Sequence, residues 1–411
     1  MDPRIVVGLD IGTTKVCTVI AKVNDRNDLE ILGVGIVPSK GLRKGVVINI
    51  DSTAECIRAS VEKAEIQAGV EVKGVYIGIS GGHIEGINSR GVIAVSDRNK
   101  EITESDVRRV VDAATAIVIP VDREVIHIIP QEFIVDDQDG IRDPVGMSGI
   151  RLEAVVHIIT AAATSVNNIV KAVNKAGLDA VDIVLEPLAC AQAVLSEEEK
   201  ELGVALVDVG GGTTDYVIFE EGSLRHTGVL SIGGNHITQD VAYGLKTPIQ
   251  SAEEIKRKYG ASIADYVSPE EELEVSGLGG RMPTFEKRQM LAEIMQPRIE
   301  EILSLVNDAI EKTGDRNFLA AGVVLTGGVS LTPWIADLAG EIFQLPVRIG
   351  KPLGVKGLKD IVDSPLFSTA VGLNLYGQFN MPKLGPTNTK DEEKNFKSII
   401  DRMRDWFNEF F

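Results

Sequence analysis

The apolar positions of the chain form the same pattern twice. Residues 5–10 and 204–208 are apolar, β-branched runs that end in an aspartate, and a turn rich in glycine and threonine follows each run. Two more strand-like runs and a helical pattern come next in both halves, at 16–23, 29–37 and 52–68, and again at 216–220, 224–232 and 237–245. Runs of β-branched residues predict strands, and a 3.6-residue period predicts helices. The repeat therefore predicts an α/β protein with two related lobes that face each other.

Two insertions and a tail interrupt this repeat. Residues 83–160 have a strand and helix pattern of their own, in which Thr103 and Asp106 form a capping-box sequence before a helix predicted over 107–117. The predicted division is a first lobe (1–82 and 161–195) with an inserted α+β subdomain (83–160), a second lobe (196–246 and 312–377) with a largely helical insertion (247–311), a polar linker (378–395) and a C-terminal amphipathic helix (396–411). The linker has too few apolar residues to form a core, so we expect it to be flexible.

Composition narrows the classes of function. The chain has 411 residues and a formal net charge of −18, which argues against nucleic acid as a partner because phosphate binding needs clustered Lys and Arg. The three cysteines are far apart in the sequence, which disfavours a metal site or a disulfide framework. We recognise no signal peptide and no apolar run of membrane-spanning length, so we expect a cytoplasmic protein.

The two glycine–threonine turns suit a phosphate ligand. Glycine lets the backbone approach an anion and present its N–H groups, threonine hydroxyls add donors, and a strand-end carboxylate can hold Mg²⁺ through water. The turns consist of Asp10, Gly12, Thr13, Thr14 and Lys15 in the first half, and of Asp208, Gly210, Gly211, Gly212, Thr213 and Thr214 in the second. One such turn also occurs in ordinary hairpins, but two that face each other predict a nucleotide cleft. A third turn ends a buried strand in Gly327 and Gly328, and we expect a helix to begin near 331–333.

Five ordered motifs carry a resemblance to a known superfamily. They are DIGTTK (10–15), EPLACA (186–191), DVGGGTTD (208–215), VLTGGVS (324–330) and TAVGL (369–373). This set resembles the two phosphate, two connecting and one adenosine motifs of the actin/Hsp70/sugar-kinase superfamily. Within it, the chain resembles the FtsA family of bacterial actin-like cell-division proteins nearly end to end, including the insertion at 83–160. The resemblance implies an actin-like two-lobed ATPase fold.

The same resemblance implies a site for ATP and Mg²⁺. Asp10 and Asp208 would organise the metal, and the residues of the two turns would contact the phosphates. Gly327 and Gly328 would flank adenosine, with Glu253 and Lys256 beside it. The catalytic candidates are Glu186, which would orient an attacking water, and Asp208. Glu186 fits a helix-start acid before Pro187 equally well, and Glu253 and Lys256 also fit an exposed (i, i+3) pair. Whether ATP is hydrolysed stays open.

The implied function is that of a cell-division scaffold. Such a protein polymerises at the cytoplasmic face of the cell membrane at the division septum, anchors the FtsZ ring there and helps to recruit other divisome proteins. Two alternatives share the fold: a phosphotransferase like the sugar kinases, and an actin-like scaffold of pilus assembly. A kinase needs a base for its substrate hydroxyl, and the sequence offers none beyond the acids already assigned. An Hsp70-like chaperone would need a large domain after the second lobe.

A peptide partner and a membrane surface complete the expectations. The C-terminal peptide of FtsZ is acidic and apolar, and Arg281, Arg288 and Arg298 lie beside apolar residues on a helical pattern in the second insertion. A solvated basic helix face is the alternative interpretation.

In the tail, eight apolar residues fall on one helical stripe: Phe396, Ile399, Ile400, Met403, Trp406, Phe407, Phe410 and Phe411. This segment is too short and too charged on its other face to span a bilayer, so we expect it to lie in the membrane interface.

Overall fold

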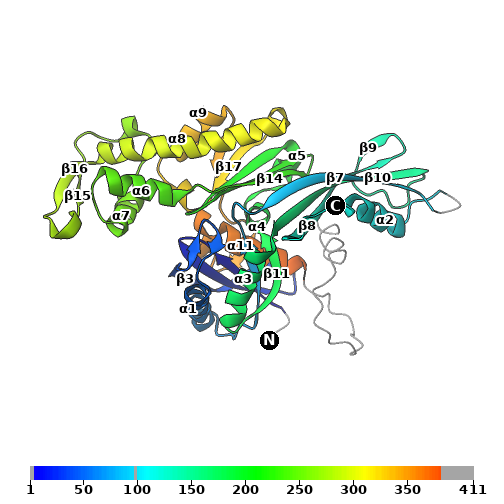
Figure 1. The fold of residues 1–411 in the computed structure, drawn as a ribbon, viewed down its shortest axis with the longest axis horizontal. Helices are drawn as coiled ribbons and strands as arrows, with labels where there is room; N and C mark the ends of the chain where they lie inside the picture. The colour runs from blue at the N-terminus through cyan, green and yellow to red at the C-terminus, as the bar shows by residue number, and fades with distance from the viewer. Residues whose placement is uncertain (1–3, 97–99, 381–411) are drawn as a thin grey trace.

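The described residues form two large sheets, one four-stranded sheet and two two-stranded ribbons (Figure 1). The computed structural model describes residues 4–96 and 100–380. Each large sheet carries one half of the sequence repeat, so the predicted pair of α/β lobes is confirmed. The predicted C-terminal helix at 396–411 and the linker beyond residue 380 lie outside the described residues, and the residue limits of the predicted division remain a prediction. Among the described helices, none has the length and apolar character that a membrane span needs.

The first lobe is a six-stranded sheet with helices on both faces. Its elements are β1 (Ile5–Ile11), β2 (Lys15–Val23), β3 (Leu29–Pro38), β4 (Leu42–Arg43), β5 (Val46–Val47), α1 (Ile50–Ala68), β6 (Gly74–Ile79), α3 (Ala163–Lys175), β11 (Asp179–Leu185), α4 (Glu186–Val194), β19 (Val355–Gly357), α10 (Lys359–Val362) and α11 (Ser368–Phe379). The strand order is β11-β6-β1-β2-β3-β19. Because the sheet is covered on both faces, β1 is buried at every position.

Two glycines allow these helices to pack closely on the sheet. A Cβ on Gly8 in β1 would lie 2.3 Å from the carbonyl oxygen of Ala370 in α11. A Cβ on Gly33 in β3 would lie 2.2 Å from the carbonyl oxygen of Ala64 in α1. The strand register places the two glycines on opposite faces of the sheet, so α1 and α11 cover opposite faces. Each glycine is therefore needed for its size.

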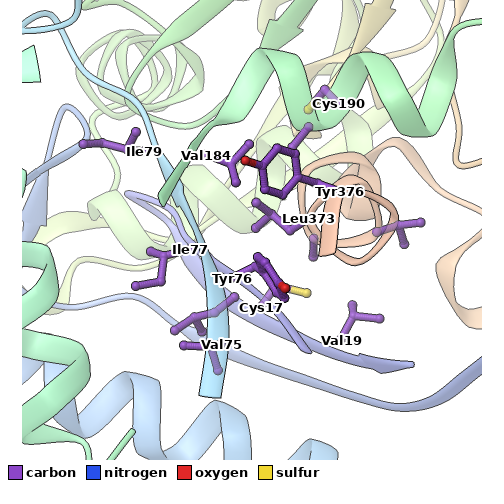
Figure 2. Packing of buried hydrophobic residues seen from close by; sticks show 14 of the residues in the cluster. Cys17, Val19, Val75, Tyr76, Ile77, Ile79, Val184, Cys190, Leu373 and Tyr376 are labelled. Atoms are coloured by element: carbon purple, nitrogen blue, oxygen red, sulfur yellow. The ribbon is translucent and has the colours of Figure 1, made fainter. Parts of the chain in front are cut away.

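The core of the first lobe is formed by apolar residues from both layers. The rings of Tyr76 of β6 and Tyr376 of α11 lie 6.1 Å apart, and Figure 2 shows both in the cluster that also includes Cys17, Val184 and Leu373. The three cysteines of the chain are all buried and free, as the sequence predicts for a protein without a disulfide framework. Apolar burial at about 25 cal/mol per Å² is the main force that holds such a core together.

The second lobe is a five-stranded sheet with the order β14-β13-β12-β17-β18. Its elements are α5 (Glu197–Leu202), β12 (Val204–Val209), β13 (Thr214–Glu220), β14 (Ser223–Leu230), α6 (Gly234–Gly244), α7 (Ile249–Tyr259), β15 (Glu272–Val275), β16 (Thr284–Lys287), α8 (Arg288–Thr313), β17 (Gly322–Thr326), α9 (Ile335–Phe343) and β18 (Val347–Ile349), with short 3₁₀ turns that include η1 (Ala264–Tyr266) and η4 (Gly328–Leu331). β12 repeats the role of β1: it is buried at every position and pairs antiparallel with the strand that follows it.

The insertion within the first lobe forms the four-stranded sheet, with the order β7-β10-β8-β9. Its elements are β7 (Glu85–Ala94), α2 (Glu104–Thr115), β8 (Arg123–Val135), β9 (Gln138–Ile141) and β10 (Arg151–Ala162). The predicted capping box is confirmed, since Thr103 and Asp106 each accept a hydrogen bond from the other residue's backbone N–H. In Figure 1 this sheet extends away from the first lobe and lies beside β14 of the second.

Several helix limits differ from the sequence expectation. The helix predicted over 107–117 spans Glu104–Thr115, because Thr103 is its N-cap. The helix expected near 331–333 begins at Ile335, because Trp334 has a φ of 63°, which a right-handed helix cannot include. α11 continues to Phe379, two residues into the predicted linker. β19 and α11 lie on the first sheet, although the predicted division assigns 312–377 to the second lobe.

Candidate nucleotide site

The two glycine–threonine turns meet across a cleft between the lobes. The cleft opens to solvent, and residues of both turns line it. A Cβ on Gly211 would lie 2.3 Å from Cγ2 of Thr14, and a Cβ on Gly212 would lie 2.4 Å from Oγ1 of Thr13. The turns therefore face each other directly, and only glycine fits at these positions of the second turn. Both turns present backbone and hydroxyl donors to the same space.

Each turn follows a strand that ends in a buried aspartate. Asp10 forms an ion pair with Lys15, the last residue of its own turn. Burial lowers the pKa of the Lys15 ammonium, but the negative groups around it, Asp10 first among them, together outweigh burial, so the net pKa is raised and Lys15 stays charged. Within the described part of the chain Asp208 forms no ion pair of its own; its Oδ2 accepts hydrogen bonds from Sγ of Cys190 at 3.1 Å and from Oγ1 of Thr369 at 3.4 Å. Burial raises the pKa of Asp208.

Two more carboxylates line the cleft and have raised pKa values. Burial raises the pKa of Asp215 to about 7, although a hydrogen bond from Ser80 opposes this shift. Burial, followed by the charges of Asp10, Asp215 and Asp208, raises the pKa of Glu186 well above its usual value. Glu186 is the first residue of α4, and its side chain lies over Gly78 of β6. The excess of negative charge would be relieved by a cation.

The arrangement of these acids fits Mg²⁺ held mainly through water. Within the described part of the chain, no group of three or more His, Cys, Asp or Glu side chains is placed to hold a metal ion by itself. Mg²⁺ commonly keeps several waters and binds one or two carboxylates together with substrate phosphates. Asp10 and Asp208, at equivalent ends of β1 and β12, could fill that role beside a bound phosphate chain.

The third glycine turn, after β17, also lines the cleft from the second lobe. Gly327 has a φ of 84°, and a Cβ there would lie 2.2 Å from Oδ1 of Asp208, so conformation and space both demand glycine. Gly328 begins η4 and also lines the cleft, as do Pro365 and Leu366 from the segment before α11. These apolar side chains lie where a nucleoside would need a non-polar wall.

Most of the sequence-predicted residues line this cleft, and three do not. Thr214 is buried and donates its hydroxyl to the carbonyl oxygen of Ile232 at 2.9 Å, away from the cleft. Glu253 and Lys256 form the predicted (i, i+3) ion pair at 2.6 Å. They lie one layer behind the cleft, where Lys256 Nζ also contacts the carbonyl oxygen of Gly234 at 3.2 Å. A role for this pair in nucleoside binding remains a prediction.

The sequence interpretation missed four polar or backbone groups that line the cleft: Gly45, Ser80, Asp215 and Thr369. Two of them had a signal. Asp215 ends the second turn as Lys15 ends the first, and Thr369 begins the TAVGL motif. Gly45 lies at the tip of the β4–β5 hairpin, and its N–H donates to Thr13 Oγ1 at 3.1 Å. Ser80 had no local signal, because its partners are far away in the sequence.

The predicted basic residues of the second insertion have mixed surroundings. Arg288 forms an ion pair with Glu271 at 2.6 Å and donates to the carbonyl oxygen of Tyr259. Arg298 is paired with Asp240 at 2.6 Å and also with Glu301. Arg281 is exposed, and its guanidinium has no ion-pair or hydrogen-bond partner among the residues that the structure describes. The three arginines are therefore not equivalent.

Solved structures support the fold. The chain is similar to the PilM–PilN type IV pilus biogenesis complex, with 18% identity, a TM-score of 0.63 and coverage of 91% of this chain and 98% of that one. It is also similar to MreB5 of Spiroplasma citri bound to ADP, with 15% identity, a TM-score of 0.54 and coverage of 91% and 96%. Together with the cleft and its paired turns, these likenesses define an actin-like, two-lobed protein with an inserted subdomain.

The sequence comparisons identify the family. The model of the cell division protein FtsA matches residues 205–372, and the model of the SHS2 domain inserted in FtsA matches residues 81–160. The chain is 44% identical to the cell division protein FtsA of Pseudomonas aeruginosa, over 98% of this chain and 97% of that protein. It is 42% identical to FtsA of Neisseria meningitidis serogroup B, over 99% of both.

The chain belongs to the FtsA family and is an actin-like cell-division protein. This membership decides between the sequence alternatives in favour of the division protein over the sugar-kinase-like enzyme and the pilus scaffold.

Proposed function

We propose that this division protein binds ATP with Mg²⁺ in the cleft and, in that state, assembles into filaments on the membrane that hold the FtsZ ring at the septum. The observation that carries the proposal is the meeting of two equivalent turns, Gly12–Lys15 and 210–213, each behind a buried strand-end aspartate. This geometry would bring hydrogen-bond donors from both lobes, and the Lys15 ammonium from the first, to one phosphate chain. A ligand that contacts both lobes at once favours the closed form of the cleft.

Different residues of the cleft would contact the phosphates, the Mg²⁺ ion and a water molecule. Lys15 supplies positive charge on the first lobe, and the backbone N–H groups of Gly211 and Gly212 would supply donors on the second, since the N–H of Gly210 donates to the carbonyl oxygen of Thr213 at 3.0 Å. Asp10 and Asp208 would hold Mg²⁺, which neutralises phosphate charge when it is bound. Glu186 lies in the cleft, where burial raises its pKa, and in its ionised form it could accept a proton from an attacking water. The rate of hydrolysis does not follow from this arrangement, and a slow or absent ATPase is compatible with a scaffold.

The peptide of FtsZ would bind on the second insertion, around Arg281. This residue lies between the strands β15 and β16, next to Met282 and close to Phe285, whose exposed fractions are 84% and 71%. An unpaired guanidinium beside exposed apolar side chains suits an acidic and apolar peptide. Arg288 and Arg298 would contribute only if they exchanged their present carboxylate partners, so reversal of the Arg281 charge gives the cleaner test.

The tail would supply the membrane contact. Its eight apolar residues, which include Trp406 and Phe407, would enter the interface, and the burial of one large side chain contributes roughly 1.5–3 kcal/mol at most. Because the charged residues of the tail nearly cancel, attraction to anionic lipid would be modest. One copy would bind reversibly, and a filament firmly, since many tails act together.

Sedimentation with lipid vesicles tests the proposal as a whole. We expect the full chain to pellet with vesicles more completely with Mg-ATP than with no nucleotide, and an ATPase assay on the same samples reports turnover. A variant with Trp406 and Phe407 both changed to Glu should stay in the supernatant while it still binds ATP. If ATP does not bind, the cleft assignment is wrong; if the double variant pellets like the parent, the tail is not the anchor.

A further inference from the structure

Ser80 forms one of the hydrogen bonds that join the two lobes inside the cleft, besides those that Asp208 accepts from Cys190 and Thr369. Ser80 follows β6 of the first lobe, and its Oγ donates to Oδ1 of Asp215 on β13 of the second lobe at 2.5 Å. Oγ of Ser80 also lies 3.3 Å from Oγ1 of Thr213 in the phosphate turn. Both Ser80 and Asp215 are buried, and both line the cleft. A hydrogen bond to a charged group is stronger than a neutral one, so this contact holds the end of β6 to the second lobe.

Ser80 also lies at the start of the connection to the inserted sheet. Residues 81–84 join it to β7, and the first two of them are Gly81 and Gly82. Gly81 has a φ of 138°, and a Cβ there would lie 2.6 Å from the ring of His83. A Cβ on Gly82 would lie 2.4 Å from Oγ of Ser231, just after β14 of the second lobe. The connection therefore begins with two residues without side chains, of which Gly82 packs closely against the second lobe, and it has the composition of a hinge.

The entry and the exit of the inserted sheet are clamped together. The guanidinium of Arg123 donates to the carbonyl oxygens of His83 at 3.0 Å and of Thr160 at 3.1 Å. It also contacts Oγ1 of Thr160 at 2.9 Å and Oε1 of Glu85 at 3.0 Å. His83 and Glu85 lie where the chain enters the sheet, and Thr160 lies where it leaves. A displacement at the hinge would therefore move both strands β7 and β10 together.

The inserted sheet touches both lobes beyond this hinge. The N–H of Leu185, at the end of β11, donates to Nε2 of His127 at 3.0 Å. On the other side, Nε2 of Gln131 donates to the carbonyl oxygen of Leu224 in β14 at 2.7 Å, and Oγ of Ser223 donates to the carbonyl oxygen of Gln131 at 2.8 Å. A change in the angle between the lobes must therefore alter the contacts of the inserted sheet with one of the two lobes.

We propose that Ser80 is a positioning residue of the nucleotide site that transmits the state of the cleft to the inserted sheet. The inference rests on the proposed binding of a nucleotide. Phosphate in the cleft competes for Thr213 and for the surroundings of Asp215, which are the groups that hold Ser80. A shift of Ser80 then turns the hinge at Gly81–Gly82, and the Arg123 clamp carries the turn into the sheet. The surface of the inserted sheet thus takes a different position in the ATP and ADP states.

Distance measurements between spin labels test this inference. The native cysteines are all buried, so cysteines introduced at exposed positions can be labelled selectively. Glu62 on α1 marks the first lobe, Asp112 on α2 the inserted sheet, and Glu341 on α9 the second lobe. The full chain is measured in dilute solution with ADP and with a non-hydrolysable ATP analogue. We expect the Glu62–Glu341 and Glu62–Asp112 distances both to shift between the two nucleotides.

Ser80→Ala separates the inference from the proposed function. In this variant, with either nucleotide at a saturating concentration, we expect the Glu62–Glu341 shift to persist and the Glu62–Asp112 shift to be lost, since one hydrogen bond is removed from the protein. Ser39→Ala is the matched control, because the Ser39 hydroxyl is buried near the first turn without a hydrogen-bond partner in the described residues. Gly82→Ala should displace the Glu62–Asp112 distance even without nucleotide.

Three outcomes overturn the inference. The Glu62–Asp112 distance could stay constant in the parent although both nucleotides bind. It could shift as much in Ser80→Ala as in the parent. Ser39→Ala could abolish the shift as completely as Ser80→Ala does, which would remove any special role of Ser80. By contrast, a parent protein that binds neither nucleotide would contradict the proposed function itself, and the inference would fall with it.

Discussion

The two phosphate turns have similar sequences, but their side chains make different contacts. The first ends in Lys15, which neutralises Asp10 within the same lobe. The second ends in Asp215, which reaches across the cleft to Ser80. The first turn presents threonine side chains at the contact between the lobes, and the second presents glycines that make room for them. A repeated motif thus gives one turn that supplies charge and one that supplies backbone donors and a contact to the other lobe.

Removal of the two strand-end aspartates should affect the two turns unequally, and this is the largest effect that we expect. Asp208→Ala should weaken Mg-ATP binding by more than about tenfold, which corresponds to about 1.4 kcal/mol. Asp10→Ala should cost less, because it frees the Lys15 ammonium to attract phosphate. Isothermal titration with Mg-ATP measures both, with the exposed Asp112→Ala as a control. Near-normal affinity in a folded Asp208→Ala protein would contradict the assignment of the cleft.

Of the two turns, the second should add the larger slope to the pH dependence of stability. The pKa of Asp215 is about 7 in the folded protein and 3.8 for the free side chain. Its contribution to the free energy of unfolding is therefore fully present below pH 3.8 and is lost as the pH rises through about 7. Relative to Asp215→Asn, which does not titrate, the parent should lose up to about 1.4 kcal/mol per pH unit in this window.

Urea unfolding of the nucleotide-free protein at several pH values between 5 and 8 measures this difference. Lys15 stays charged over that range because Asp10 raises its pKa, so Lys15 adds no slope. The exposed Asp112→Asn is the matched control. A constant difference between the parent and Asp215→Asn across the range would show that the carboxyl does not titrate there.

A methyl group should be tolerated differently in the two turns. Gly211→Ala introduces a Cβ that meets Thr14 of the other lobe, so it should hinder closure and weaken nucleotide binding by about 1 kcal/mol, at the low end for overpacking. Thr14→Ala in the same protein should recover part of the loss. Gly12→Ala meets the carbonyl oxygen of Lys15 in its own turn at 3.0 Å, so Thr14→Ala should not rescue it. Equal rescue of both variants would refute a contact specific to the second turn.

The sequence predicted the features that depend on neighbouring residues. The strand-end aspartates, the glycine turns, the capping box at Thr103 and the ion pair of Glu253 with Lys256 are all encoded within a few positions. They could be predicted because a strand, a turn or a helix face brings such residues together whatever the rest of the fold does.

The features that the sequence did not predict depend on distant partners. Ser80 and Asp215 are 135 positions apart, and Arg298 meets Asp240 from a different helix. Arg288 and Arg298 therefore looked available for a partner, although their charges are already paired inside the protein. Only the arrangement of the elements in space decides such contacts, and one sequence does not contain that arrangement in a local pattern.

The smallest expected effect on nucleotide binding concerns Thr214. Its predicted contact with phosphate depends on the face of β13 from which its side chain projects. β13 begins at Thr214, and side chains alternate between the faces of a strand, so Thr213 and Asp215 face the cleft while Thr214 faces the other way. Its hydroxyl donates to the carbonyl oxygen of Ile232 at 2.9 Å. Thr214→Val keeps the shape and removes this bond, so we expect the free energy of unfolding to fall by about 0.5–1 kcal/mol and the affinity for Mg-ATP to stay within about twofold of the parent, since no ligand contact is lost. Thr213→Val, the matched change on the cleft side, should weaken nucleotide binding more than it weakens the fold. If Thr214→Val reduces ATP affinity as strongly as Thr213→Val does, the alternation along β13 does not govern this turn.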